Sequence, residues 1–140
     1  MITTDLNKLE LTEFIAKGKP GQRCKATFPL LGAHGTKESA TVYFELDPGE
    51  ELGTHTDSAE ELLIILEGTL EARVGTEKGT VSKNQLVVVP KMEPHNFRNV
   101  GDGKAKVLGF FGGANNIVAT FDQIWWPTGS NQVDTSTIPG

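Results

Sequence analysis

The chain has 140 residues, enough for one domain with a substantial hydrophobic core. Its hydrophobic fraction of 37% and charged fraction of 22% are ordinary for a soluble globular protein. The formal net charge of -5, together with the lack of a basic stripe, argues against a nucleic-acid-binding surface.

The sequence favours a cytoplasmic location. The first residues, 1–5, lack the basic segment and apolar run of a signal peptide, and the longest apolar run, 62–66, is too short to cross a membrane. The single cysteine, Cys24, excludes an internal disulfide and fits a reducing compartment. We therefore expect neither a membrane partner nor a nucleic-acid partner.

Residues 1–22 are predicted to form an N-terminal extension. Within it, Leu6, Leu9, Phe14 and Ile15 roughly share one face of a helix over residues 5–17. The turn residues of segment 18–21 would end this short helix.

After residue 22 the pattern changes to short β segments separated by turn residues. The predicted strands cover residues 23–31, 39–47, 52–56, 61–66, 69–74, 79–82, 86–89, 95–99, 104–111 and 116–121. Polar and apolar residues alternate clearly over 39–47 and 104–111. Many short strands at regular spacing predict an all-β sandwich or barrel over residues 23–121, followed by an irregular tail, 122–140, that packs on the barrel or on a partner subunit.

Side chains two residues apart on a strand point the same way, which predicts three inward-facing sets. The sets are His55 with Asp57; Glu61 with Leu63 and Ile65; and His95 with Phe97 and Asn99. If these faces meet inside a barrel, the interior holds two imidazoles, one or two carboxylates and an apolar wall. Such donors suit Fe(II), Mn(II), Ni(II) or Zn(II), and two histidines with one carboxylate are typical of non-haem iron oxygenases.

Two motifs make the sequence resemble a small single-domain cupin, with a texture similar to germins. Gly49, His55, Glu61 and Gly68 fall in register with the first cupin motif, and Pro90, His95 and Asn99 with the second. Met92 stands where the second motif has a glycine. The resemblance implies a double-stranded β-helix, or jelly roll, with His55, Glu61 and His95 as metal ligands inside the barrel.

Asp57 occupies the position at which most metal-binding cupins have a second histidine of the first motif. It can be a further ligand, which favours the harder Mn(II) or Fe(II) over Zn(II). It can instead orient a ligand or act as a catalytic base. The third alternative is a degenerate site, in which the same residues form a polar network without metal.

The leading functional hypothesis is a metal-dependent enzyme, of the dioxygenase type, that acts on a small organic substrate. Leu63, Ile65, Phe97 and Phe111 would surround the substrate and exclude water, although such residues are more often plain core. The alternatives are a non-catalytic binding or sensory protein and a metal-assisted isomerase or lyase. Apolar residues on outward faces, such as Tyr43, Leu108 and Phe110, predict a homodimer.

Overall fold

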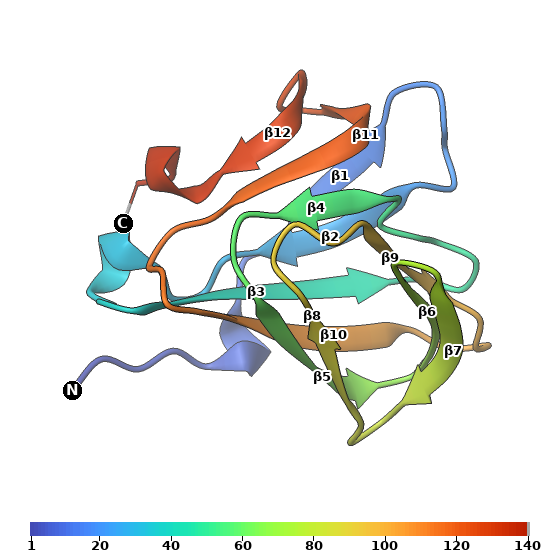
Figure 1. Cartoon of the computed structure of the whole chain (residues 1–140), viewed down its shortest axis with the longest axis horizontal. Coiled ribbons are helices and arrows are strands. Elements are labelled where there is room, and N and C mark those ends of the chain that lie inside the picture. The colour runs from blue at the N-terminus through green and yellow to red at the C-terminus, as the bar shows by residue number, and fades with distance from the viewer. Residues whose placement is uncertain (140) are drawn as a thin grey trace.

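The computed structural model describes residues 1–139 and is all-β over that range (Figure 1). Its strands are β1 (Thr12–Ala16), β2 (Arg23–Thr27), β3 (Ser39–Leu46), β4 (His55–Asp57), β5 (Glu61–Glu67), β6 (Thr69–Val74), β7 (Glu77–Ser82), β8 (Leu86–Val89), β9 (His95–Asn99), β10 (Ala105–Gly112), β11 (Val118–Trp126) and β12 (Ser130–Asp134). Three short 3-10 helices complete it: η1 (Leu6–Lys8), η2 (Gly32–His34) and η3 (Thr135–Thr137). No helix in residues 1–139 is long and apolar enough to cross a membrane.

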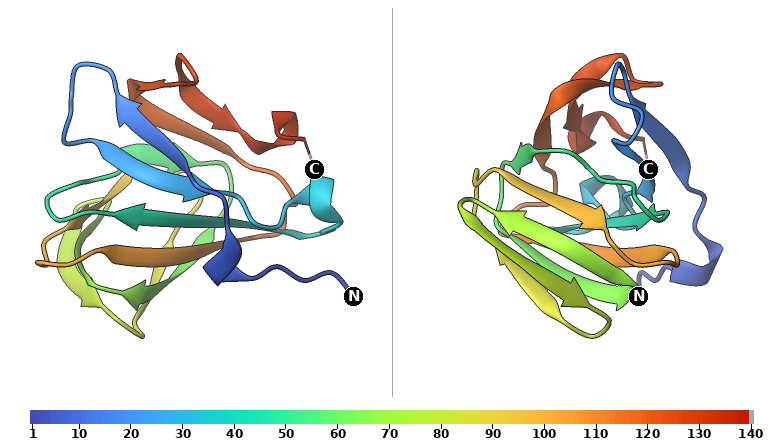
Figure 2. Two further views of the ribbon diagram at one scale, coloured as in Figure 1. Left: turned by 180° about the vertical axis from the view of Figure 1, so that it is seen from behind. Right: turned by 90° about the vertical axis from the view of Figure 1, so that its right-hand side faces the viewer.

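The strands form one antiparallel sheet that curls into a nearly closed barrel (Figure 2). The strand order is β7-β6-β9-β4-β11-β1-β2-β3-β10-β5-β8, with β12 added beside β11. Strands distant in sequence therefore become neighbours: β4 lies between β9 and β11. The predicted all-β jelly-roll architecture is confirmed.

Alternation decides which side chains enter the barrel. On β10, Ala105, Val107, Gly109 and Phe111 are buried and the residues between them are partly or fully exposed, as predicted. The same rule buries alternate residues of β5 and β9. Side chains from opposite sides of the sheet consequently meet in the interior.

The prediction of a helix over residues 5–17 is wrong. Only the single 3-10 turn η1 forms, capped by the Asp5 side chain, which accepts a hydrogen bond from the Asn7 backbone N–H at 2.9 Å. Residues 12–16 instead form β1, which pairs with β2 and β11. Pairing with the edges of β2 and β11 favours a strand here over the helix that the weak amphipathic pattern indicated, because β propensity depends strongly on tertiary context.

The N-terminal segment also covers an outward face of the barrel. Tyr43 points away from the interior but is only 4% exposed, because Leu6, Leu9 and Leu11 lie around it. Its hydroxyl donates a hydrogen bond to Glu45 at 2.7 Å. The Tyr43 ring is therefore buried, and its hydroxyl hydrogen-bonded, within one chain, so no partner subunit is needed to cover it.

The segment after Asp122 is more regular than the predicted irregular tail. Strand β11 continues through it to Trp126, turns, and returns as β12 along β11. The division of the chain at residues 22 and 121 stays a prediction.

The buried apolar residues form two clusters. One is built around Phe44, Leu63 and Phe97, and the other around Leu31, Phe111 and Ile117. The polar residues of the interior lie where residues of both clusters meet.

Candidate metal centre

Strand β4 is short and carries two of the interior polar residues. His55 and Asp57 are 7% and 4% exposed, whereas Thr56 between them is only partly buried. On one side β4 pairs with β11, and on the other His55 faces His95 of β9 in the ladder. The pairing places two histidines that are forty positions apart in the sequence directly opposite each other.

Both histidines are oriented by backbone carbonyls. The Nδ1 atom of His55 lies 2.8 Å from the Gly53 oxygen, and that of His95 lies 2.8 Å from the Glu93 oxygen. A carbonyl only accepts, so each Nδ1 carries the proton and donates it. The Nε2 lone pair of each ring is left free as a ligand, the usual arrangement around a bound metal.

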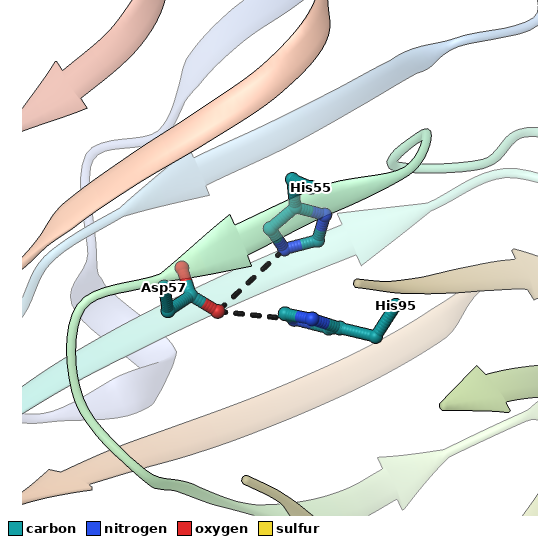
Figure 3. Close-up of side chains that lie close together, drawn as sticks. All are labelled: His55, Asp57 and His95. Atoms are coloured by element: carbon teal, nitrogen blue, oxygen red, sulfur yellow. Dashed lines mark ion pairs between the residues drawn. The ribbon is translucent and has the colours of Figure 1, made fainter. Parts of the chain in front are cut away.

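The two Nε2 atoms converge on one carboxylate oxygen (Figure 3). Asp57 Oδ2 lies 3.0 Å from His95 Nε2 and 3.8 Å from His55 Nε2. One donor atom from each of the three residues lies within 4.8 Å of the others. Glu61 stands at the side of this group, with Oε1 3.8 Å from His95 Nε2.

The donor set fits a divalent metal. Asp57 Oδ2 and His95 Nε2 are buried and have no hydrogen-bond partner among residues 1–139. Two lone pairs 3.0 Å apart repel each other unless a cation lies between them. Ligands about 2.0–2.2 Å from one metal ion, at right angles to tetrahedral angles, are separated by about 2.8–3.6 Å. The Asp57–His95 separation of 3.0 Å falls within this range, and the Asp57–His55 separation of 3.8 Å lies slightly above it.

The electrostatics keep His55 neutral. Burial, followed by the neighbouring His95, lowers the pKa of His55 to about 4. Burial, followed by the charge of Asp57 and a hydrogen bond to it, raises the pKa of Glu61 well above its ordinary value. Neutral imidazole is the form that binds a metal, so the protein prepares His55 for ligation.

A glycine makes room for Glu61. A Cβ atom added at Gly109, on the neighbouring strand β10, would lie 2.4 Å from Glu61 Oε2 and 2.9 Å from Val42 Cγ1. Any side chain at this position would displace the Glu61 carboxyl.

Three of the four polar residues line an apolar cavity, whose empty space of about 660 Å³ includes open solvent at its mouth. His55, Asp57 and Glu61 belong to its wall, while His95 is buried behind them. The other lining residues are Phe14, Cys24, Ala26, Phe28, Val42, Phe44, Leu52, Leu63, Phe97, Phe111, Ile117, Ala119, Phe121, Trp125 and Val133. The cavity therefore lies between the two hydrophobic clusters.

The structure brings together His55, Asp57, Glu61 and His95, all of which the sequence had singled out. Of the candidate substrate-binding residues, Leu63, Phe97 and Phe111 line the cavity. Ile65 is fully buried in the first cluster and is not part of the cavity wall that the structure describes.

Sequence reasoning missed much of the aromatic wall. Phe14 had been placed on a helix, and no signal pointed to Phe28 or Phe121. Trp125 lies in the segment that was predicted to be an irregular tail; it is 3% exposed and lines the cavity.

Comparison with known protein families identifies the fold. The sequence model described as "Cupin domain" matches residues 42–111, which is half of the chain. The chain belongs to the cupin family. No curated protein matches this cupin in sequence.

Solved structures resemble this cupin over most of its length. A predicted oxalate decarboxylase from Thermotoga maritima has a TM-score of 0.68 at 18% identity, covering 79% of this chain and 97% of that one. The polyketide cyclase RemF from Streptomyces resistomycificus has a TM-score of 0.65 at 16% identity, covering 80% and 79%. The Cnp3 cupin domain from Schizosaccharomyces pombe has a TM-score of 0.65 at 15% identity, covering 80% and 74%. At these identities the likeness establishes the fold, and the different names of these proteins show that the fold alone does not define an activity.

Proposed function

We propose that this cupin is a metal-dependent oxygenase that acts on a small, largely apolar organic molecule inside the barrel. The observation that carries the proposal is the convergence of His55, Asp57 and His95 beside an apolar cavity, with the buried Asp57 Oδ2 and His95 Nε2 atoms left without hydrogen-bond partners among residues 1–139. Two histidines and one carboxylate that leave coordination positions free are characteristic of non-haem iron oxygenases.

The cavity wall narrows the substrate class. Within residues 1–139 no lysine or arginine lines the cavity, and seven of its lining residues are aromatic. A dicarboxylate would have only the metal as a cationic partner, so its second charge would lie unpaired in an apolar site, which is costly. An aromatic molecule with a chelating pair of oxygen atoms, such as an enol, a diketone or a catechol, fits this wall better.

The residues of the site would have three roles: metal binding, exclusion of water and proton transfer. His55, Asp57 and His95 would hold the metal, and Fe(II) or Mn(II) suits this donor set. When bound, the metal supplies a Lewis acid and a route for electrons between the chelated substrate and dioxygen. The surrounding phenylalanines exclude water from the reacting atoms. Glu61, beside His95, is either a fourth ligand or the group that takes the substrate's proton.

The first experiment measures metal. Wild type, His95→Ala and the control Glu60→Gln are each reconstituted with Fe(II), Mn(II), Ni(II) or Zn(II), desalted, and analysed for bound metal. Glu60 is exposed and adjacent to Glu61, so its variant should bind metal as wild type does. We expect one metal per wild-type chain and a large loss in His95→Ala. Substoichiometric metal in wild type with every ion would refute the metal site.

The second experiment measures chemistry. Oxygen uptake is followed with a panel of catechols, enols and diketones, and substrate loss is followed in parallel without oxygen. Oxygen consumption coupled to substrate loss supports the oxygenase. Substrate loss under anaerobic conditions would instead indicate metal-assisted isomerase or lyase chemistry, for which Glu61 is the group placed to move a proton. Binding without turnover in either condition would indicate a binding protein.

Glu61→Gln separates the two roles of Glu61. Reduced metal affinity identifies Glu61 as a ligand, because an amide oxygen binds these ions less tightly than a carboxylate. Unchanged metal affinity together with lost turnover identifies it as the proton carrier.

A further inference from the structure

The indole N–H of Trp125, on β11, has no hydrogen-bond acceptor among residues 1–139. The side chain is only 3% exposed and forms part of the cavity wall. A buried tryptophan N–H usually finds an acceptor, because an unpaired donor loses its hydrogen bond to water without replacement. A molecule bound in the cavity that Trp125 lines is one source of that acceptor.

Aromatic contacts connect Trp125 to the metal centre. Phe121 stacks on the His55 ring, with centroids 4.5 Å apart and planes 15° apart. Trp125 meets Phe121 edge to face, with centroids 5.2 Å apart, and meets Phe14 in the same manner at 6.4 Å. The indole is therefore held by rings on two sides, and one phenylalanine separates it from a candidate metal ligand.

The neighbouring residue provides an internal comparison. Trp126 is 64% exposed, so its indole is free to contact water. Strand alternation thus points one of the two adjacent tryptophans into the barrel and the other away from it. The inward one leaves a buried N–H without a partner among residues 1–139, whereas the outward one is accessible to water.

We infer that the Trp125 N–H donates a hydrogen bond to an acceptor atom of the substrate, and that this atom lies at the opposite end of the molecule from the metal-binding oxygens. The substrate class is then a planar aromatic molecule with a chelating oxygen pair at one end and a lone ring nitrogen or carbonyl at the other. The chelating end rests on the proposed function, whereas the acceptor end rests on Trp125 alone.

A competing explanation is that the N–H points at the face of Phe14 or Phe121, to which the indole is nearly perpendicular. Such N–H···π contacts are weak but satisfy a donor in part. In that case the protein would have no preference for a ligand that carries an acceptor at the far end.

The test uses two matched probes, 2,3-dihydroxynaphthalene and 6,7-dihydroxyisoquinoline. Both carry a catechol, and they differ only in that a ring nitrogen replaces one CH of the distant ring. Their dissociation constants are measured by calorimetry at mildly alkaline pH, with wild type, Trp125→Phe and the control Trp126→Phe. We expect wild type and Trp126→Phe to prefer the isoquinoline by about three- to tenfold. Trp125→Phe should lose this preference or favour the naphthalene, because the ring nitrogen would be buried without a donor.

The measurement separates this inference from the proposed function. The ratio of the two dissociation constants reports on Trp125. The change in both constants between metal-loaded and metal-stripped protein reports on the metal. A normal ratio without an effect of metal would refute the metal site and leave the Trp125 inference standing. Equal binding of both probes to wild type, a preference that survives in Trp125→Phe, or failure of both probes to bind would overturn it.

A second readout does not depend on the Trp125 variant folding. In protein with nitrogen-15-labelled tryptophan, Trp126→Phe retains one indole N–H signal, that of Trp125. The isoquinoline should shift its proton strongly downfield, as a new hydrogen bond does, and the naphthalene should not. Equal shifts with both probes would contradict the inference.

Discussion

His55 and His95 are direct partners in the β4–β9 ladder, and their ring centroids are 4.0 Å apart. Each ring is held by a carbonyl two residues before it in the chain. The same Nδ1–carbonyl contact on two strands therefore turns both Nε2 atoms toward Asp57. The residue at position 57 consequently decides which third donor atom the site offers to a metal.

Replacing Asp57 with histidine should change the metal preference. If position 57 faces the metal, Asp57→His supplies a third imidazole, and Zn(II) and Ni(II) should bind more tightly than to wild type because imidazole suits them. Competition with a coloured chelator measures this. Thr56→His, on the same strand but facing outward, is the control, and equal gains in both variants would contradict the assignment.

Gly109→Ala, on strand β10, should displace the Glu61 carboxyl and so disturb the metal centre. The new methyl group would lie 2.4 Å from Glu61 Oε2, so the Glu61 carboxyl must move. We expect a loss of stability of about 1–3 kcal/mol, measured by urea denaturation, and altered metal affinity. Gly112→Ala, on the same strand with nothing within 4 Å of its added Cβ, should leave both unchanged. Similar losses in the two variants would indicate a general effect on β10.

Met92→Gly should stabilise the protein. Met92 has a φ of 62°, in the left-handed region that is costly for side chains other than those of glycine, asparagine and aspartate. Relief of this strain, less the greater flexibility of glycine in the unfolded chain, leaves a gain of about 0.5–1 kcal/mol. Asn84→Gly at φ 71° should gain less, because asparagine tolerates this region. A loss of stability in Met92→Gly would show that side-chain contacts of Met92 outweigh its backbone strain.

The Cys24 thiol should make stability fall at high pH. Burial, followed by the charge of Glu50, raises the pKa of Cys24 to about 12. The unfolded chain then loses this proton first, so its ionisation favours unfolding. The contribution is intact below the unfolded-state value of 9.0 and is lost as pH rises toward 12. Between about pH 8 and about pH 10.5, wild type should lose more unfolding free energy than Cys24→Ala. Parallel pH profiles for the two proteins would argue against a buried, protonated thiol.

The outer face of β10, β5 and β8 should mediate a homodimer. Phe110, Leu62 and Val88 are adjacent across these strands, and their side chains are 44%, 45% and 54% exposed. Apolar groups gathered in this way are typical of an interface. Light scattering should give twice the chain mass of 15.1 kDa for wild type. Leu62→Glu should be monomeric, and Thr80→Glu on β7 should remain dimeric. A monomeric wild type at tens of micromolar would rule the interface out.

Local pattern predicted the central strands well. The period of two residues in β3 and β10 follows from burial of one face, and the bounds of β6, β8 and β9 agree with the predicted ranges. Strands β1 and β12 were missed because partners distant in sequence stabilise them, and local sequence carries little trace of those partners.

The site was predictable to the same extent as the fold. Strand alternation predicted that His55, Asp57 and His95 face inward, because alternation is a local property of a strand. The register that opposes His55 to His95, and the place of Trp125 in the cavity wall, depend on tertiary pairing and could not be predicted. Met92 is an intermediate case: the motif has a glycine there, and the positive φ at Met92 explains why. Asn99 likewise belongs to the motif for a structural reason, since its side-chain amide donates to the carbonyls of Leu46 and Gly103, both at 2.8 Å.

The cavity between the two hydrophobic clusters has a practical consequence. A compound that fills it contacts both clusters of the core at once. Because such a compound binds only the folded barrel, its binding raises the free energy of unfolding and therefore the melting temperature. The melting temperature can then serve as a detector of the natural substrate. A thermal-shift screen of aromatic metabolites, run with and without added metal, would rank candidates before any reaction product is known.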